Sequence, residues 1–236
     1  DVTRQIFESL VTVNSKYEVV PQLAESVEQS EDGKTYTFPL RKGVLFHNGK
    51  EMTAEDVVAS MNRWKETASS IPTPLKEGTF EAKDEHTVVL QVTEPSALIL
   101  PILAKTLQFA AIMPKEVVEA ADEKGINEFV GTGPFKFAEW KQDQYIQLTQ
   151  YEDYQPLEET ADGLAGKKEA LVDDVYFDVV PDAATQVAGI QTEQYDIVTD
   201  LPNEYYEQVT NTPNLNVEVS SYGHQALLFD KNDGWF

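Results

Sequence analysis

The chain has 236 residues, of which 41% are hydrophobic and 10% aromatic, so a disordered chain is excluded and a sizeable core can form. Its 41 acidic and 18 basic residues give a formal net charge of −23, which disfavours nucleic acid and anionic lipid as partners because both bind clustered Lys and Arg. The absence of cysteine excludes disulfides, thiolate metal sites and a cysteine nucleophile, and no apolar run reaches the length of a transmembrane helix.

The beginning of the chain predicts a helix, and a strand follows further along. Residues 4–11, RQIFESLV, have apolar side chains at helical spacing. Residues 36–41, YTFPLR, alternate between apolar and other side chains and predict a half-buried strand. Pro39 marks an edge of the sheet or a missing ladder hydrogen bond. The side chains expected on the buried face of this strand are Tyr36, Phe38 and Leu40.

The next stretch predicts a tight turn and a capped helix. Asn48-Gly49 is a strong turn signal because both residues tolerate positive φ. Thr53 then begins a helix, and Asp56 stands three residues on, close to the pattern of a capping box. His47, alone beside the turn, is interpreted as a surface or packing residue. The face of the helix expected to be buried carries Ala54, Val57, Met61 and Trp64.

Further hairpins and helices follow as far as residue 150. Residues 80–92 predict a hairpin that turns at 83–85, and residues 131–151 predict a second hairpin that turns near Gln142 and Asp143. Between them, residues 95–107 predict a buried helix containing Pro101, and residues 114–125 predict a helix that Pro114 opens and Gly125 ends. The acidic residues 152–170 predict a surface excursion.

The last part of the chain alternates strands and helices. Strands are predicted at 173–180, 195–198, 214–221 and 224–230, and helices at 182–192 and 202–210. This alternation favours a parallel or mixed sheet with helices on its faces, and therefore an α/β fold. Residues 1–10 and 151–236 are predicted to form this sheet subdomain, with residues 11–150 inserted into it as a hairpin-rich subdomain.

No motif in the sequence predicts catalysis or a metal site. The segment GTGPF lacks the Walker and dinucleotide-binding patterns and leads into a strand, so Gly131 and Gly133 are interpreted as permitting a tight backbone path. His47, His86 and His224 are too far apart in sequence to pair on one helix, and no nucleophile elbow is present. We therefore predict no catalytic residue, no metal ligand and no cofactor.

The order of the local motifs resembles the family 5 extracellular solute-binding proteins, the dipeptide, oligopeptide and nickel-chelate receptors of ABC importers. The resemblance is carried by LAES, DG, YTF, LRKG, FHNG and TAEDVV over residues 21–63. The segments VGTGPFKFAEW, VVPDAATQVAGIQTEQYDIV and ALLFDKNDGWF extend it, with Ile190, Gln194 and Asp230 departing from the residues usual in the family. The resemblance covers the first half of a family member.

The resemblance implies lobe I of a fold like that of the type II periplasmic-binding proteins, with lobe II absent. It implies a monomeric, non-catalytic receptor that closes two lobes around an extracellular peptide and delivers it to membrane permease subunits. A receptor for a nickel chelate, opine or sugar remains an alternative, as does an enzyme or enzyme-accessory domain. It also implies an extracellular or periplasmic location, with a lipid anchor in a segment preceding the chain.

The resemblance places candidate ligand contacts at the rim of the cleft. Gln108, Phe109 and Ala110 stand in the loop before IMPKEV, and Asp230 stands at the hinge edge, where a carboxylate could accept hydrogen bonds from an α-amino group. Some members of the family hold a ligand carboxylate with a basic residue near this loop. The segment LQFAAIM contains none, which argues against anchoring of a chelate's carboxylate at this loop.

Overall fold

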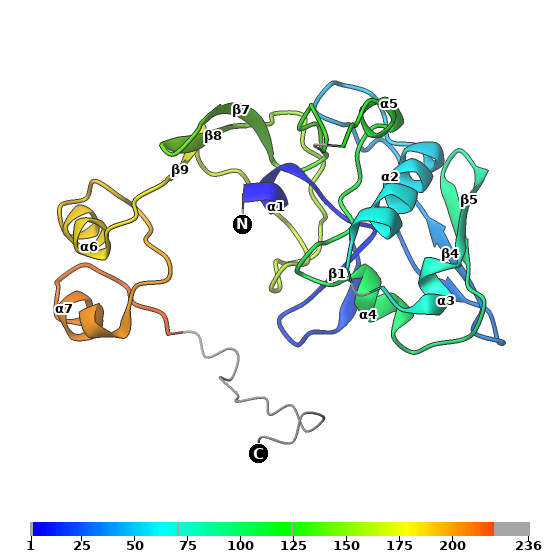
Figure 1. The fold of residues 1–236 in the computed structure, drawn as a ribbon, viewed down its shortest axis with the longest axis horizontal. Coiled ribbons are helices and arrows are strands. Elements are labelled where there is room, and N and C mark those ends of the chain that lie inside the picture. The colour runs from blue at the N-terminus through cyan, green and yellow to red at the C-terminus, as the bar shows by residue number, and fades with distance from the viewer. Residues whose placement is uncertain (1, 70, 124, 220–236) are drawn as a thin grey trace, which may run out of the picture. The chain divides into compact units, whose positions relative to one another are not determined.

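The computed structural model describes residues 2–69, 71–123 and 125–219, and the chain divides into two compact units, residues 1–178 and 179–236 (Figure 1). The first unit holds three antiparallel sheets and the second holds short helices. The longest helix among the described residues has 14 residues, and none of the described helices is both long and apolar enough to cross a bilayer.

The core of the first unit lies under a four-stranded sheet with the order β3-β4-β6-β5. Its strands are β3 (Glu28–Gln29), β4 (Thr35–Pro39), β5 (Thr79–Asp84) and β6 (Thr87–Gln91). The predicted alternation is confirmed, since Tyr36, Phe38 and Leu40 are all buried. Pro39 lies opposite Thr87 of β6, beyond the point where the short β3 has ended, so the proline interrupts no pairing with β3.

Helix α2 (Ala54–Thr67) lies beside this sheet and contacts β5 and β6 (Figure 1). The expected buried face is confirmed, because Ala54, Val57, Met61 and Trp64 are all buried. The Asn48-Gly49 turn is also present: Gly49 has a φ of 81°, and Phe46 N donates to Lys50 O at 2.8 Å. Residues 40–61 therefore form a wall of the core.

The cap of α2 is a buried charged group. Thr53 N and Oγ1 donate to Asp56 Oδ2 at 2.9 and 2.8 Å, which completes the predicted capping box. Asp56 Oδ1 accepts from Lys50 Nζ at 2.6 Å and from the backbone N–H of Lys115 at 2.7 Å. Burial of Asp56 opposes ionisation, but the hydrogen bonds from Lys50, Lys115 and Thr53 outweigh burial and lower the pKa of the carboxyl group.

The remaining elements of the first unit surround this core. Sheet β1-β2 is a short hairpin, and sheet β7-β8-β9 carries a second apolar cluster in which Ile6, Phe7 and Leu148 are buried beside helix α1. Their bounds are α1 (Val2–Ile6), β1 (Val11–Val13), β2 (Val19–Pro21), α3 (Thr73–Lys76), α4 (Ile99–Leu103), α5 (Lys115–Glu119), β7 (Phe135–Lys141), β8 (Tyr145–Gln150) and β9 (Asp174–Asp178).

Three predicted helices are shorter in the structure. The buried helix predicted at residues 95–107 is limited to α4, in which only Ile99 and Leu103 are buried. The N-terminal helix ends at Ile6 because the backbone of the next residues pairs elsewhere: Ile112 N donates to Glu8 O at 2.9 Å, and Leu23 N donates to Ser9 O at 3.2 Å. Helix α5 begins after Pro114 as predicted but ends at Glu119, so Gly125 is not its cap. Gly125 instead pairs with Asp122 in a small turn.

The second unit contains α6 (Ala183–Gln191), the 3₁₀ helix η1 (Asn203–Tyr205) and α7 (Tyr206–Thr210). Asp182 caps α6 by accepting from Thr185 N at 2.8 Å, and Gln191 Nε2 donates to Thr212 Oγ1 at 2.8 Å. The strands predicted at 195–198 and 214–219 are wrong, because these residues are not in strands and pair with no strand among the described residues. Ile197 is 81% exposed accordingly.

The predicted strand at 224–230 lies outside the described residues. Strand β9 pairs with β8, so the described pairings join segments from both predicted subdomains. The division into residues 1–10 with 151–236 and an insertion of residues 11–150 stays a prediction.

A buried carboxylate joins four distant segments of the first unit. Glu8 is only 3% exposed. Its carboxylate accepts from Thr132 Oγ1 at 3.0 Å, from Tyr154 Oη at 3.0 Å, from Lys168 Nζ at 3.1 Å and from Gln22 Nε2 at 3.5 Å. Burial, and then the neighbouring Glu8, raise the pKa of Tyr154, so its hydroxyl stays a donor. Burial of this carboxylate is tolerated because both of its oxygens accept hydrogen bonds.

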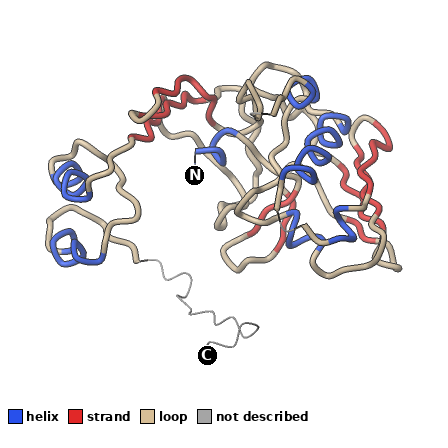
Figure 2. The backbone as a smooth tube through the Cα atoms, in the orientation of Figure 1, coloured by secondary structure: helices blue, strands red, loops and turns tan. Residues whose placement is uncertain are grey.

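The interpretation of residues 152–170 as a surface excursion is confirmed for most of the stretch, whose side chains are largely exposed. The stretch between β8 and β9 is loop (Figure 2). Tyr154 and Lys168 nevertheless reach the buried Glu8 from within it. The acidic composition of residues 152–170 predicted exposure. Composition alone could not identify the few residues of this stretch that contact the core.

Hydrogen bonds between His47 and the Gly131–Gly133 segment also connect distant parts of the chain. Gly131 N donates to His47 Nδ1 at 3.3 Å, and His47 Nε2 lies 2.9 Å from Gly133 O. Since a carbonyl can only accept and an amide N–H can only donate, the ring is neutral with its hydrogen on Nε2. Burial lowers the pKa of His47, in agreement with this tautomer. His47 is thus a packing residue, as predicted.

Gly131 and Gly133 are required by close backbone approach. A Cβ on Gly131 would lie 2.1 Å from Ile6 O, and one on Gly133 would lie 2.4 Å from Gln5 O. Any other residue would force the segment away from α1. The interpretation of GTGPF as a tight backbone path is therefore confirmed.

Glu8→Gln is expected to reduce the free energy of unfolding by about 3 kcal/mol, because it leaves the partly buried ammonium of Lys168 without its counter-charge. Urea denaturation followed by fluorescence measures this change. Glu169→Gln is the matched control, since Glu169 pairs with Lys167 at the surface and its loss should change stability by less than about 0.5 kcal/mol. Equal effects of the two substitutions would contradict the structural role of Glu8.

The lowered pKa of His47 makes stability depend on pH. The unfolded chain takes up a proton near pH 6.5, whereas the folded chain takes it up only at lower pH, so the contribution is present above about pH 6.5 and is lost as pH falls. Urea denaturation at about pH 7.5 and about pH 5.5 should show a larger loss for the unaltered chain than for His47→Gln, which cannot titrate. An identical loss in both proteins would show that His47 does not titrate differently on folding.

Candidate functional site at the loop 106–110

The loop 106–110 follows α4 and is held by the end of α2. Gln108 has a left-handed φ of 52°, and its carbonyl accepts from Trp64 Nε1 at 2.7 Å. Gln108 Oε1 accepts from Ser69 N at 3.1 Å and from Ser69 Oγ at 2.9 Å. The side-chain oxygen of Gln108 thus holds the loop in place, and only its amide nitrogen has no hydrogen-bond partner among the described residues.

The guanidinium of Arg4, on helix α1, stacks on the ring of Phe109. The guanidinium carbon of Arg4, on α1, lies 4.7 Å from the centroid of the Phe109 ring, and Arg4 Nη2 donates to Thr106 O at 2.6 Å. Such a stacked guanidinium is attracted by the face of the ring. Burial lowers the pKa of Arg4. The loop, which has no basic residue of its own in LQFAAIM, therefore has a positive charge at its side.

The end of the loop is anchored in the core. Ala110 is buried, and Ile112 is buried and donates its N–H to Glu8 O. The loop and the segment that carries Arg4 are therefore joined twice, through Thr106 and through Ile112. This double attachment fixes the position of Phe109 relative to α1.

The structure brings three of the four predicted contact residues together and leaves the fourth undecided. Gln108, Phe109 and Ala110 share one loop, whereas Asp230 lies outside the described residues. Sequence reasoning missed Arg4, because its only local signal is one basic residue in a short helix, 105 positions before Phe109 in a chain with 18 basic residues.

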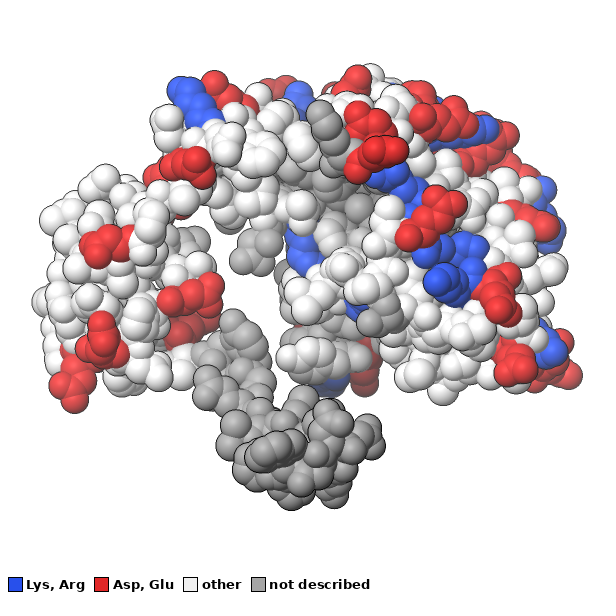
Figure 3. Space-filling view, in the orientation of Figure 1, with Lys and Arg blue, Asp and Glu red and all other residues white. Residues whose placement is uncertain are grey.

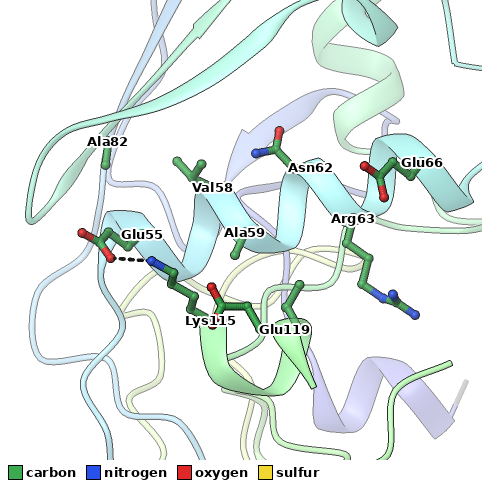
Figure 4. Close-up of a pocket in the computed structure, with 10 residues that line it drawn as sticks. Glu55, Val58, Ala59, Asn62, Arg63, Glu66, Ala82, Lys115 and Glu119 are labelled. Carbon is green, nitrogen blue, oxygen red and sulfur yellow. Dashed lines mark hydrogen bonds and ion pairs between the residues drawn. The ribbon is translucent and has the colours of Figure 1, made fainter. Parts of the chain in front are cut away.

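The surface of the first unit also has a groove of about 430 Å³ between α2 and α5, bordered by Ala82 of β5 (Figure 4). Lys115 Nζ pairs with Glu55 Oε2 across it at 3.0 Å, as the dashed line shows. On the face shown in Figure 3, the Lys and Arg side chains of this unit lie among acidic ones. One ion pair therefore already spans this groove, and its lining also carries Arg63, Glu66 and Glu119.

A second groove, of about 530 Å³, lies between the β1-β2 hairpin and residues 157–166. Within the described ranges, no three His, Asp or Glu side chains are grouped so that they could hold a metal ion. Among the described residues, Arg4 over Phe109, Lys65 over Phe80 and Lys136 over Tyr151 are cations that lie over an aromatic ring and form no ion pair.

Comparison with protein families gives a match over residues 18–236 to the bacterial extracellular solute-binding proteins, family 5 middle. Among curated proteins, a probable peptide ABC transporter periplasmic-binding protein of Sinorhizobium fredii is 33% identical over 219 residues, which is 91% of this chain and 41% of that protein. The dipeptide-binding protein of Escherichia coli is 32% identical, over 90% of this chain and 44% of that protein. The chain thus spans less than half the length of these relatives.

Solved structures show the same relationship. The periplasmic-binding protein AgaA of A. tumefaciens, in complex with agropinic acid, matches with a TM-score of 0.77 and 29% identity, over 90% of this chain and 41% of that one. The oligopeptide-binding protein AppA of Bacillus subtilis, in complex with a nonapeptide, matches with a TM-score of 0.72 and 26% identity, over 90% of this chain and 41% of that one. These are type II periplasmic-binding proteins, which confirms the predicted fold class.

The family match covers residues 18–236, which is nearly the whole chain. The chain belongs to the bacterial extracellular solute-binding proteins of family 5.

Proposed function

We propose that this chain is part of lobe I of a receptor that captures peptides outside the cytoplasmic membrane and delivers them to the permease subunits of an ABC importer. The observation that carries the proposal is the family match over residues 18–236, together with relatives whose names specify peptide, dipeptide and oligopeptide binding. The mechanism is capture: two lobes close around the solute and bury it, and the closed receptor docks on the permease.

The loop 106–110 is proposed as a contribution of this lobe to the ligand site. The ring of Phe109 supplies apolar surface, and the free amide nitrogen of Gln108 can donate a hydrogen bond to a peptide carbonyl. Ala110 ends the loop, and Asp230 is proposed to accept from the α-amino group of a peptide. Residues 1–10 with 151–236 are proposed as the sheet subdomain and residues 11–150 as its insertion.

A receptor for another solute is the second candidate. The nickel-binding periplasmic protein of Escherichia coli is 30% identical over 94% of this chain, and AgaA was solved with agropinic acid, so the same fold serves chelates and opines in relatives. The relatives matched are binding proteins, and we propose no catalysis, no cofactor and no resident metal for this chain. An enzyme or enzyme-accessory domain has no observation in its favour.

The relatives named as periplasmic-binding proteins suggest the location and partners. We propose that the whole protein works outside the cytoplasmic membrane, held there by a lipid anchor, as a monomer with permease subunits as protein partners and no nucleic acid. The net charge of −23 supports the last point.

The 236-residue chain alone is expected to bind di- to pentapeptides far more weakly than the whole protein, because closure of two lobes supplies most of the buried surface. Isothermal titration calorimetry of both proteins with one peptide panel measures the difference. Micromolar binding by the 236-residue chain would refute the two-lobe mechanism.

Mass spectrometry of small molecules that co-purify with the whole protein identifies the solute class. Peptides are expected. Recovery of a metal chelate, an opine or a sugar, with no peptide, would replace the proposed solute while leaving the receptor function in place.

A further inference from the structure

Strand β5 is an edge of the four-stranded sheet, because β6 is the one strand it pairs with among the described residues. On the other side of β6, Leu40 N donates to His86 O and Val92 N donates to Lys34 O. Successive residues of an antiparallel ladder direct their backbone groups to alternate sides. The β6 segment therefore bonds to β4 through its even-numbered residues and to β5 through its odd-numbered residues.

The odd-numbered residues of β6 lie opposite Thr79 and Glu81 of β5. Phe80 and Ala82 of β5 therefore direct their backbone N–H and C=O groups away from β6, toward the open side of the sheet. These outward groups form no hydrogen bond with another described residue. A free edge of this kind can accept a strand from another chain.

Both ends of β5 are tied to helix α2. Lys65 Nζ, which lies over the Phe80 ring, donates to Gly78 O at the beginning of the strand. Ala54 N, at the beginning of the helix, donates to Glu85 O in the turn after the strand at 2.8 Å. The helix therefore runs alongside β5 in the opposite direction and holds it in place. An edge fixed in advance loses little conformational freedom when a partner binds.

The groove of about 430 Å³ lies beside this edge. Its apolar lining includes the half-buried Val58 of α2 and Val118 of α5, and Ala82 borders it from β5. Val58 and Asn62 extend from the side of α2 on which Ala82 lies (Figure 4). Side chains of an added strand would alternate in direction, so every second one would point toward this groove. Backbone bonds to a strand edge and a groove for alternate side chains are the two parts of a strand-addition site.

The charges at the groove and on β5 indicate which strand fits. Glu66 and Glu119 line the groove and Glu81 lies on β5, and none of these carboxylates forms an ion pair in the described part of the chain. Arg63 and Lys83 are unpaired as well, so unpaired carboxylates outnumber unpaired cations here. A second copy of the chain is disfavoured, because each copy carries a net charge of −23 and the two repel. A segment that contains Lys or Arg is favoured.

We propose that β5 and the groove beside α2 form a docking site for an extended segment of another protein, which contains Lys or Arg and joins the sheet as a fifth strand. The outward backbone groups of Phe80 and Ala82 supply the hydrogen bonds, and the groove accepts alternate side chains. The inference goes beyond the proposed function, because the site contains no residue of the loop 106–110 and its ligand is a protein partner and not the solute.

Nuclear magnetic resonance of the 236-residue chain tests the docking site, because it detects millimolar binding and locates it. The probe is the peptide Thr-Lys-Val-Lys-Val-Thr with both ends blocked. It is expected to shift the backbone amide signals of Phe80 and Ala82 and to slow hydrogen exchange at both. The same peptide with all backbone nitrogens methylated cannot donate to the edge and should bind about ten-fold more weakly or worse. Thr-Glu-Val-Glu-Val-Thr should also bind more weakly.

Substitutions at the edge give a matched comparison. Ala82→Pro removes an outward N–H while the bonds between β5 and β6 remain, and it should weaken binding of the Lys peptide by about ten-fold or more. Ala82→Ser keeps the N–H and should leave binding unchanged. Glu81→Lys should weaken the Lys peptide and strengthen the Glu peptide. Glu31→Lys makes the same charge change in the exposed turn before β4 and should alter neither.

The outcomes decide between the docking site and the solute site. Shifts confined to the loop 106–110, or no shift at β5 at millimolar peptide, would overturn the docking site. Equal binding of the methylated peptide, or unchanged binding after Ala82→Pro, would show that the β5 edge is not used and would overturn it as well. Equal binding of the Lys and Glu peptides would overturn the preference for a basic segment.

Discussion

The buried carboxylate of Glu8 is the constraint on which the first unit depends. A charge that is 3% exposed must be paired on every side, and its partners come from residues 22, 132, 154 and 168. The hairpin β1-β2, the GTG segment and the long loop between β8 and β9 are therefore held at one point. Loss of the Glu8 charge therefore weakens the hydrogen bonds that hold all three segments together.

The same segment of chain sets the geometry of the candidate site. Glu8 lies four residues after Arg4, and its backbone carbonyl accepts from Ile112 at the end of the loop that carries Phe109. The contacts that fix the backbone at Glu8 therefore also keep the guanidinium of Arg4 over the Phe109 ring. Gly131 and Gly133 allow this arrangement, because their missing side chains let the GTG segment lie against the carbonyls of residues 5 and 6.

The family membership and the site suggest a division of work within the molecule. The four-stranded sheet and helix α2 enclose the larger apolar core, and the buried Asp56 of α2 is paired with Lys50. The loop 106–110 is held to α2 through Trp64 and carries the Phe109 ring, on which the guanidinium of Arg4 stacks. We propose this loop, held in place by α2 and α1, as the contribution of these residues to a solute site.

The sequence by itself determined the local elements and the family. Alternation at Tyr36 to Leu40, the Asn48-Gly49 turn and the Thr53–Asp56 box are each encoded within a few adjacent residues, and their order carries the family resemblance. It also excluded thiol chemistry, through the absence of cysteine.

Only the tertiary structure decided where charges meet. The Glu8 network and the approach of Arg4 to Phe109 join residues up to 160 positions apart, and neither partner has a local pattern that names the other. The strand expected at residues 195–198 was wrong for the same reason, because a strand needs a neighbour to pair with and none of the described strands lies beside it. Contacts between distant residues are set by how the elements pack, and local sequence determines only the elements.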